Sequence, residues 1–276
     1  MGPKHHAAPP INPHHHITNN QVRTSGWSCI LQDWSDISVT VAPAAELCDR
    51  CNINVSIRTL SVATGVGEPV PLSLNQRRAP DSLEIEALAA LRGLVGVQKL
   101  LGVCPETLTL ITEYSGETWT GVLERGQSVQ ECLKVLRQVC QITETIHARG
   151  WVHVDIKADN ICVHHTSEGI QATIIDFGLA MRIGEQADFP EGTQCAYIAP
   201  EVLENRPCTP AADVYSIATM FHFSAQYCNF SARCPLRLYM TRALEPRQHQ
   251  RPGMTLLTTV CSKALDMRRR YRVIYV

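Results

Sequence analysis

The chain has 276 residues, 45% of them hydrophobic and 18% charged, and its formal net charge is −1. These values are typical of a globular protein with one large domain or two small lobes around a cleft. The balanced charge gives no general attraction to nucleic acid or to an anionic membrane, and no run of about 18 apolar residues predicts a membrane span. We therefore expect an intracellular protein, cytoplasmic or nuclear, with neither nucleic acid nor membrane as a partner.

The first 26 residues carry five histidines and four prolines and few apolar side chains. Such a segment cannot bury enough surface to fold, so we expect a disordered tail. Cys48 and Cys51 form a C-x-x-C pair, but no second pair lies at a suitable distance for a zinc ribbon. The cysteines are therefore interpreted as reduced loop or core thiols.

After the tail, short runs rich in Val, Ile and Thr at 37–41 and 53–57 predict strands. Several glycines and prolines in 61–80 predict a loop. The apolar spacing of 84–91, which follows the possible N-caps Asp81 and Ser82, predicts a helix.

Two further patterns follow before residue 150. Residues 100–103 and 108–112, separated by Pro105, predict a β-hairpin. In 131–149 apolar positions recur along one helical face, which predicts a helix. Its expected core positions are Leu133, Leu136, Cys140 and Ile146.

Two polar segments come after this helix. His-Val-Asp-Ile-Lys-Ala-Asp-Asn at 153–160 supplies Asp155, Lys157 and Asn160, and Ile-Ile-Asp-Phe-Gly at 174–178 adds Asp176. Phosphoryl transfer requires such a set: a carboxylate that orients the attacking hydroxyl, a cation near the moving phosphate, and oxygen ligands for Mg²⁺.

These segments resemble the catalytic loop and the Asp-Phe-Gly motif of protein kinases. Four other stretches continue the resemblance in the family's order: a hinge-like 111–114, Ala-Pro-Glu at 199–201, Asp-Val-Tyr-Ser at 213–216, and 244–252 with its arginine. The resemblance implies an α+β, bilobal protein-kinase fold with a small β-rich N-lobe containing one helix and a larger helical C-lobe. We expect the kinase domain at 27–262, with lobes at 27–112 and 116–262, and a basic tail at 263–276.

The resemblance also implies roles for single residues. Asp155 is similar to the catalytic base and Lys157 to the residue that steadies the γ-phosphate, while Asn160 and Asp176 are similar to the Mg²⁺ ligands. The implied reactants are ATP with Mg²⁺ and a protein substrate, and Lys157 favours serine or threonine as acceptor. Structural roles are implied for His153 and Phe177 (stacked together), Asp213 (bracing the catalytic loop), and Glu201 with Arg251 (a buried ion pair).

The nucleotide-binding half departs from the family pattern. The family covers the phosphates with a glycine-rich turn, but the best-placed equivalent, 31–39, ends at Val39 and contains no glycine. Gly65 and Gly67 form a second candidate, which we disfavour because only a short stretch separates them from the helix at 84–91. Glu113 and Ser115 are the expected hinge contacts with nucleotide.

The strand lysine that binds phosphate in the family is also replaced. Val-Ser-Ile-Arg at 55–58 places Arg58 at that position, and Glu84 is the expected helix partner, with Glu86 as the alternative. Arginine keeps the charge but is planar and bulkier. Lys99 precedes a strand that we expect to lie away from the cleft, so its recruitment is disfavoured.

The segment after Asp-Phe-Gly departs in a different way. Val154 stands where the family usually has an arginine before the catalytic aspartate, and residues 179–192 contain no Ser, Thr or Tyr. We expect no control by phosphorylation there. The spacing of Thr193 leaves open whether it is the substrate-facing threonine.

Two functions are therefore compared. The first is a serine/threonine protein kinase, favoured by the complete set Asp155, Lys157, Asn160 and Asp176. The second is a pseudokinase, a binding or scaffolding module, favoured by Arg58 and by the loop without glycine. A small-molecule kinase is disfavoured by the Ala-Pro-Glu motif, which ends a protein-substrate segment.

Overall fold

The computed structural model describes residues 82–104, 109–228, 230 and 234–272, together with four earlier strands at 16–17, 37–41, 56–64 and 70–76. The chain divides into two compact units, one of residues 1–79 and 100–114 and the other of residues 80–99 and 115–276. The possible glycine-rich turns and the Cys48–Cys51 pair lie outside the described residues, apart from the strand that contains Val39.

The smaller unit contains a six-stranded antiparallel sheet in the order β1-β2-β3-β4-β6-β5. The predicted strand at 37–41 is confirmed as β2, and the predicted hairpin is confirmed as β5 with β6. The strand predicted at 53–57 overlaps β3 at its last two residues, and its first three residues lie outside the described part of the chain. The strands are β1 His16–Ile17, β2 Ile37–Val41, β3 Ser56–Thr64, β4 Val70–Gln76, β5 Leu100–Cys104 and β6 Thr109–Glu113.

The prediction of a loop throughout 61–80 is wrong, because β3 runs to Thr64 and β4 occupies Val70–Gln76. Pro71 argued against a strand that is paired on both sides. However, the ladder between β4 and β6 begins only at Leu72. Pro71 is therefore not required to donate a backbone hydrogen bond to β6. The tail prediction also needs correction at His16 and Ile17, which form β1 beside β2.

The larger unit is mainly helical, with two small sheets, β10-β9-β7 and β11-β8. Its helices are α2 Ser82–Ala90, α3 Trp119–Glu124, α4 Val129–Ala148, α5 Pro200–Leu203, α6 Ala211–Tyr227, α7 Pro235–Ala243 and α8 Met254–Arg272. The strands are β7 Glu117–Thr118, β8 Trp151–Val152, β9 Ile161–Thr166, β10 Gly169–Ile174 and β11 Met181–Arg182, and 3-10 turns lie at Ala158–Asn160 and Gln248–Gln250. The predicted helix at 84–91 is confirmed as α2, and its contacts group it with this unit.

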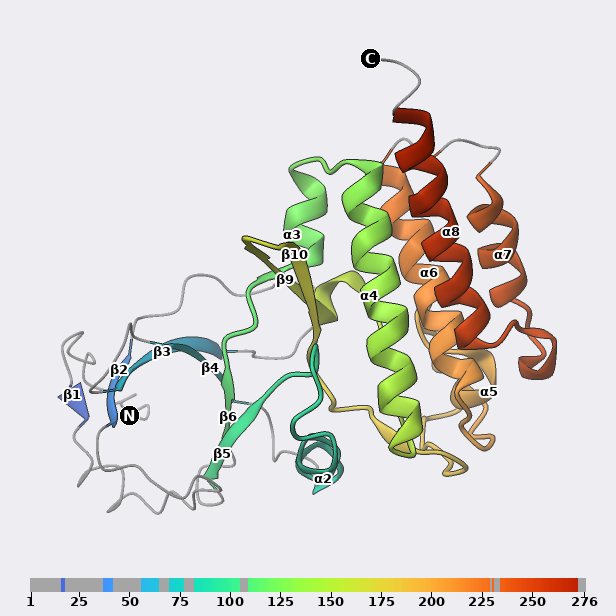
Figure 1. Ribbon diagram of the computed structural model, residues 1–276. Coiled ribbons are helices and arrows are strands. Elements are labelled where there is room, and N and C mark those ends of the chain that lie inside the picture. Colours follow the sequence, from blue (N-terminus) through green and yellow to red (C-terminus); the bar gives the residue numbers. More distant parts are fainter. Residues whose placement is uncertain are drawn as a thin grey trace, which may run out of the picture. The chain divides into compact units, whose positions relative to one another are not determined.

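Helix α4 is the central element of the larger unit (Figure 1) and packs against α6, α8 and β10. It begins after Ser128, whose hydroxyl accepts the N–H of Glu131 at 3.2 Å and donates to the Glu131 carboxylate at 3.0 Å. This reciprocal capping pairs an N–H that the first turn of the helix cannot bond itself. The four predicted core positions of this helix are all buried, so the predicted apolar face is confirmed.

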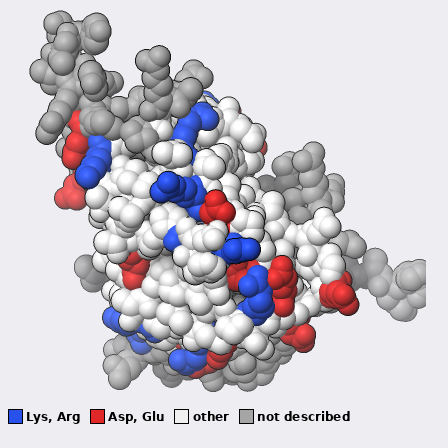
Figure 2. All heavy atoms as spheres, turned by 90° about the vertical axis from the view of Figure 1, so that its right-hand side faces the viewer, with Lys and Arg blue, Asp and Glu red and all other residues white. Residues whose placement is uncertain are grey.

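Helix α8 continues to Arg272, past the domain boundary expected at 262, so residues 263–272 extend the last helix. None of the described helices is long and apolar enough to cross a membrane. On the face shown in Figure 2, basic and acidic side chains are interspersed, in keeping with the balanced composition.

Candidate active site

Three predicted catalytic residues meet in the segment that follows β8. The Lys157 ammonium donates to Asp155 Oδ2 at 2.5 Å, and the Asn160 side-chain amide donates to the same oxygen at 3.0 Å. Asn160 also donates to the backbone carbonyl of Asp155 at 2.9 Å. These contacts hold the Asp155 carboxylate, which is 7% exposed, between a cation and an amide.

The backbone before Asp155 is held by α6. The Asp213 carboxylate accepts the N–H of His153 at 2.9 Å and the N–H of Val154 at 2.7 Å, which confirms the bracing role expected for Asp213. The Ser216 hydroxyl lies 3.1 Å from the Val154 carbonyl. Val154 has φ 73, a conformation that a β-branched residue adopts only when its surroundings impose it. Asp213 and Ser216 of α6 therefore contact the backbone of residues 153 and 154.

Asp213 is itself held as a carboxylate. Burial raises the pKa of Asp213. The hydrogen bond that His147 donates at 2.8 Å outweighs this effect, together with the fields of His147 and His153 and the hydrogen bond from the His153 N–H. The pKa of Asp213 is therefore held below its ordinary value. A carboxyl group with a lowered pKa in the folded state stabilises the fold above its unfolded pKa of about 3.9. This contribution is lost as the pH falls below that value.

We expect Asp213→Asn to lower the free energy of unfolding by about 3 kcal/mol at pH 7, because it leaves buried N–H groups without an anionic acceptor. The difference in unfolding free energy between wild type and variant should narrow as the pH is lowered below about 4, because the aspartate of the unfolded chain takes up a proton before the folded Asp213 does. Urea unfolding between pH 3 and pH 7 measures both. A difference that stays constant over this range would contradict the assignment.

Asp176 lies at the start of the second motif, with φ 66. Its N–H donates to Gln98 Oε1 at 3.0 Å, and its carboxylate accepts the N–H of Gly178 at 3.3 Å. The preceding residue, Ile175, donates its N–H to the Asn160 carbonyl at 2.9 Å, which ties the two motifs together.

The predicted stacking of His153 and Phe177 is confirmed. The ring centroids are 4.8 Å apart in an edge-to-face arrangement, and both residues are fully buried. His153 Nε2 donates to the Ile175 carbonyl at 3.0 Å, which fixes the proton on that nitrogen. The pair therefore joins the two motifs through the core.

The donor set fits a magnesium ion. Asn160 uses its amide nitrogen to bind Asp155, so its side-chain oxygen is the atom that it can offer to a cation. Asp176 adds a carboxylate, and oxygen atoms are the ligands that Mg²⁺ prefers, with waters and substrate phosphates completing its shell.

Lys157 is charged in this setting. Burial opposes the charge, but the hydrogen bond to Asp155 and the fields of Asp155, Asp176 and Asp159 raise the pKa of Lys157 above its ordinary value. A permanently charged ammonium beside Asp155 suits the binding of a transferred phosphoryl group.

Thr193, the candidate substrate-facing threonine, lies in a turn in which its N–H donates to the Pro190 carbonyl at 3.1 Å. Its hydroxyl donates to the Pro190 carbonyl at 2.6 Å, within the same turn. The Tyr197 carbonyl is 2.6 Å from the Ser216 hydroxyl. Burial, followed by the field of Asp159, raises the pKa of the Tyr197 phenol.

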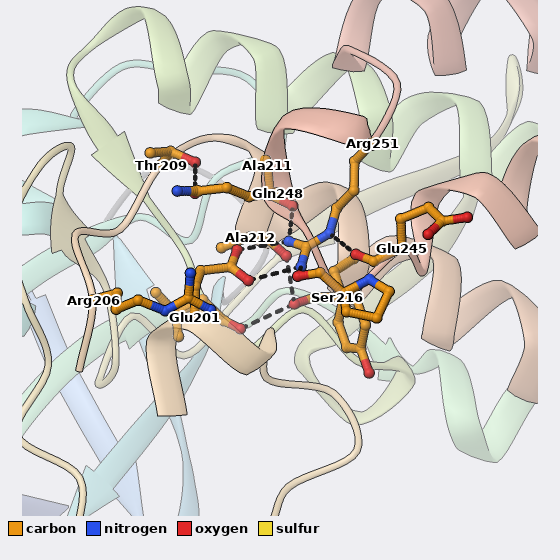
Figure 3. A network of polar contacts seen from close by, with 12 residues as sticks. Glu201, Arg206, Thr209, Ala211, Ala212, Ser216, Glu245, Gln248 and Arg251 are labelled. Atoms are coloured by element: carbon orange, nitrogen blue, oxygen red, sulfur yellow. Dashed lines mark hydrogen bonds and ion pairs between the residues drawn. The ribbon is translucent and has the colours of Figure 1, made fainter. Parts of the chain in front are cut away.

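The Ala-Pro-Glu motif is fixed by the predicted buried ion pair (Figure 3). The Arg251 guanidinium donates to the two Glu201 oxygens at 2.6 and 2.7 Å, and neither side chain is exposed to solvent. The remaining guanidinium N–H groups donate to three backbone carbonyls, those of Ala211, Glu245 and Pro246. Every donor of this buried cation is therefore satisfied.

A family model described as the protein kinase domain matches residues 78–234, which is more than half of the chain. The chain belongs to the protein kinase domain family. It is 33% identical over 172 residues to a probable myosin light chain kinase of Dictyostelium discoideum, a match covering 58% of this chain and 54% of that protein.

Two other similar proteins are the smooth muscle myosin light chain kinase of Gallus gallus and calcium-dependent protein kinase 14 of Oryza sativa subsp. japonica. The first is 38% identical over 94 residues, covering 33% of this chain and 5% of that protein. The second is 30% identical over 145 residues, covering 50% of this chain and 28% of that protein. The kinase domain thus spans about half of the Dictyostelium relative and less of the other two.

The predicted nucleotide contacts of this kinase domain are divided between the two units. Val39 lies in β2, Arg58 in β3 opposite Leu74 of β4, and Glu113 in β6. Strand β4 separates β3 from β6, so the Arg58 backbone is roughly 10 Å from the hinge strand across the sheet. Strand β4 itself contains no lysine or arginine. The role of Arg58 stays a prediction.

The other two predicted contacts lie in the larger unit. Glu84 is 2% exposed on α2, and Ser115 is partly buried after β6. Glu86, the alternative partner, is exposed and forms an ion pair with Arg182 of β11. The pairing of Glu84 with Arg58 stays a prediction, like the role of Arg58 itself.

Several residues that support the site were not predicted. Ser216 follows Asp213 by one helical turn on α6, so the i, i+3 spacing was the signal that would have identified it. Gln98 and Arg182 carried no local signal, because their partners Asp176 and Glu86 are distant in sequence.

Proposed function

We propose that this kinase domain transfers the γ-phosphoryl group of ATP to serine or threonine hydroxyls of protein substrates. The observation that supports this most directly is the Asp155, Lys157 and Asn160 cluster, connected to Asp176 through the Asn160–Ile175 backbone bond. We further propose that the protein acts inside the cell.

The proposed step uses these residues in different ways. Asp155 orients the substrate hydroxyl and accepts its proton as the hydroxyl oxygen bonds to the γ-phosphorus. The bond from that phosphorus to the β–γ bridging oxygen breaks, and ADP leaves. Lys157 stabilises the charge on the transferred group. Asn160 and Asp176 are the proposed holders of Mg²⁺, which when bound neutralises phosphate charge.

A pseudokinase is the second candidate, and one observation favours it. Strand β4, which pairs with hinge strand β6, carries no cation, and arginine occupies the position predicted for the phosphate-binding lysine. In this case the domain binds partners, with or without nucleotide, and transfers no phosphate.

We expect the wild-type chain to bind ATP more tightly with Mg²⁺ than without it, and Asp176→Ala to lose most of this difference because a metal ligand is removed. Calorimetric titration of ATP with and without Mg²⁺ measures this. Phosphate transfer to a generic protein substrate is measured on the same samples, and Asp266→Ala, an exposed aspartate on α8, is the matched control.

The outcomes separate the two candidates. Magnesium-dependent binding with turnover that Asp176→Ala removes supports the kinase. Binding without turnover in the wild type supports the pseudokinase. Equal affinity with and without Mg²⁺ would overturn the assignment of Asp176.

A further inference from the structure

The backbone after Asp-Phe-Gly is hydrogen-bonded to other parts of the larger unit at residues 181–185. Strand β11 pairs with β8, and the N–H of Ile183 donates to the Gly150 carbonyl at 2.9 Å. The N–H of Gly184 donates to the Cys208 carbonyl at 2.8 Å, and the N–H of Cys208 donates to the Glu185 carbonyl at 2.7 Å. We call residues 176–201 the activation segment.

A second attachment lies further along this segment. Asn205, in a left-handed conformation with φ 54, accepts the N–H of Phe189 at 2.8 Å and donates its amide to the Phe189 carbonyl at 2.9 Å. One side chain thereby satisfies both backbone groups of Phe189. The segment is thus fastened at two places by neutral hydrogen bonds.

Arg182 adds a charged attachment at the first place. Its guanidinium lies over the Trp151 ring, 4.8 Å from the ring centroid, and forms an ion pair with Glu86 of α2. Trp151 is 1% exposed, so the ring is a fixed surface for the guanidinium. The backbone N–H of Arg182 donates to Glu185 Oε2 at 3.1 Å. Through this residue, α2, β8 and the activation segment are in contact.

We propose that Arg182 is the positioning residue of the activation segment, and that it holds this segment against α2 and β8 without any phosphate. Residues 179–192 contain no hydroxyl that a kinase could modify, and Val154 has no charge with which to bind a phosphate. The ion pair with Glu86 and the contact with Trp151 supply a permanent charged link instead.

Hydrogen exchange tests the link without requiring activity. In Arg182→Ala we expect amides of 181–192 to exchange about fivefold faster, since an exposed ion pair and a cation–π contact are lost together. Glu86→Gln should give a smaller increase in the exchange rate of these amides. The double variant should exchange only slightly faster than Arg182→Ala, because the two residues act through one contact. Arg182→Lys should restore most of the protection.

Arg206→Ala is the matched control, because Arg206 is similarly exposed and forms its ion pair with Glu204 only two residues away. Its exchange in 181–192 should equal that of the wild type. Raising NaCl from 0.05 to 0.5 M should accelerate exchange in the wild type and have less effect in Arg182→Ala, since salt screens exposed charges.

The consequence for turnover rests on the proposed kinase function. Arg182→Ala should raise the KM for a protein substrate several-fold and leave the KM for ATP unchanged, and phosphatase treatment of the wild type should leave the rate unaltered. Unchanged exchange in Arg182→Ala, or a large loss of rate after phosphatase, would overturn the proposal. Altered exchange in a protein without turnover would support Arg182 and contradict only the proposed kinase activity.

Discussion

Asp155→Asn is expected to reduce turnover by about a hundredfold or more while ATP affinity and stability change little. An amide has nearly the same shape and keeps an oxygen that accepts from Lys157 and Asn160, which both bind Oδ2 of the native residue. It cannot take up the proton of a substrate hydroxyl, and general-base catalysis typically contributes about 10² to 10⁴ in rate. Single-turnover phosphate transfer, with ATP titrated separately, measures the two effects.

The control is Asp266→Asn, which makes the same chemical change on an exposed face of α8. It should retain the wild-type rate. Equal turnover in Asp155→Asn and in the wild type would exclude Asp155 as the base. A parallel loss of ATP affinity would mean instead that this carboxylate helps to hold the nucleotide.

Arg251→Met is expected to lower the free energy of unfolding by about 3–5 kcal/mol. The substitution leaves the Glu201 carboxylate buried without its cation, and removing one partner of a buried pair has an effect of this size. It also leaves without a donor the three carbonyls that Arg251 binds. Urea unfolding at pH 7 gives the change directly.

A double-mutant cycle separates the ion pair from these backbone contacts. Adding Glu201→Met to Arg251→Met removes the unpaired charge, so the double variant should be more stable than Arg251→Met alone. Arg206→Met, which breaks an exposed pair with Glu204, should change stability by less than about 1 kcal/mol. Equal effects of Arg251→Met and Arg206→Met would contradict the importance of burial.

The sequence alone determined the elements and contacts that depend on short spacing. Asp155, Lys157 and Asn160 lie within six residues, so the turn that follows β8 brings their side chains into hydrogen-bonding contact. The apolar face of α4 and the β5–β6 hairpin followed from local periodicity. The pairing of Glu201 with Arg251 is long-range and was predicted only because ordered motifs resembled those of a family.

The tertiary structure decided what local spacing does not encode. Strand β4 forms in a stretch where prolines and glycines predicted a loop, because β3 and β6 offer it ladder partners on both sides. The link between Arg182 and Glu86 joins residues 96 positions apart. A charge on an exposed helix face gives no indication of which distant charge it meets, since that depends on the tertiary arrangement of α2 and β11.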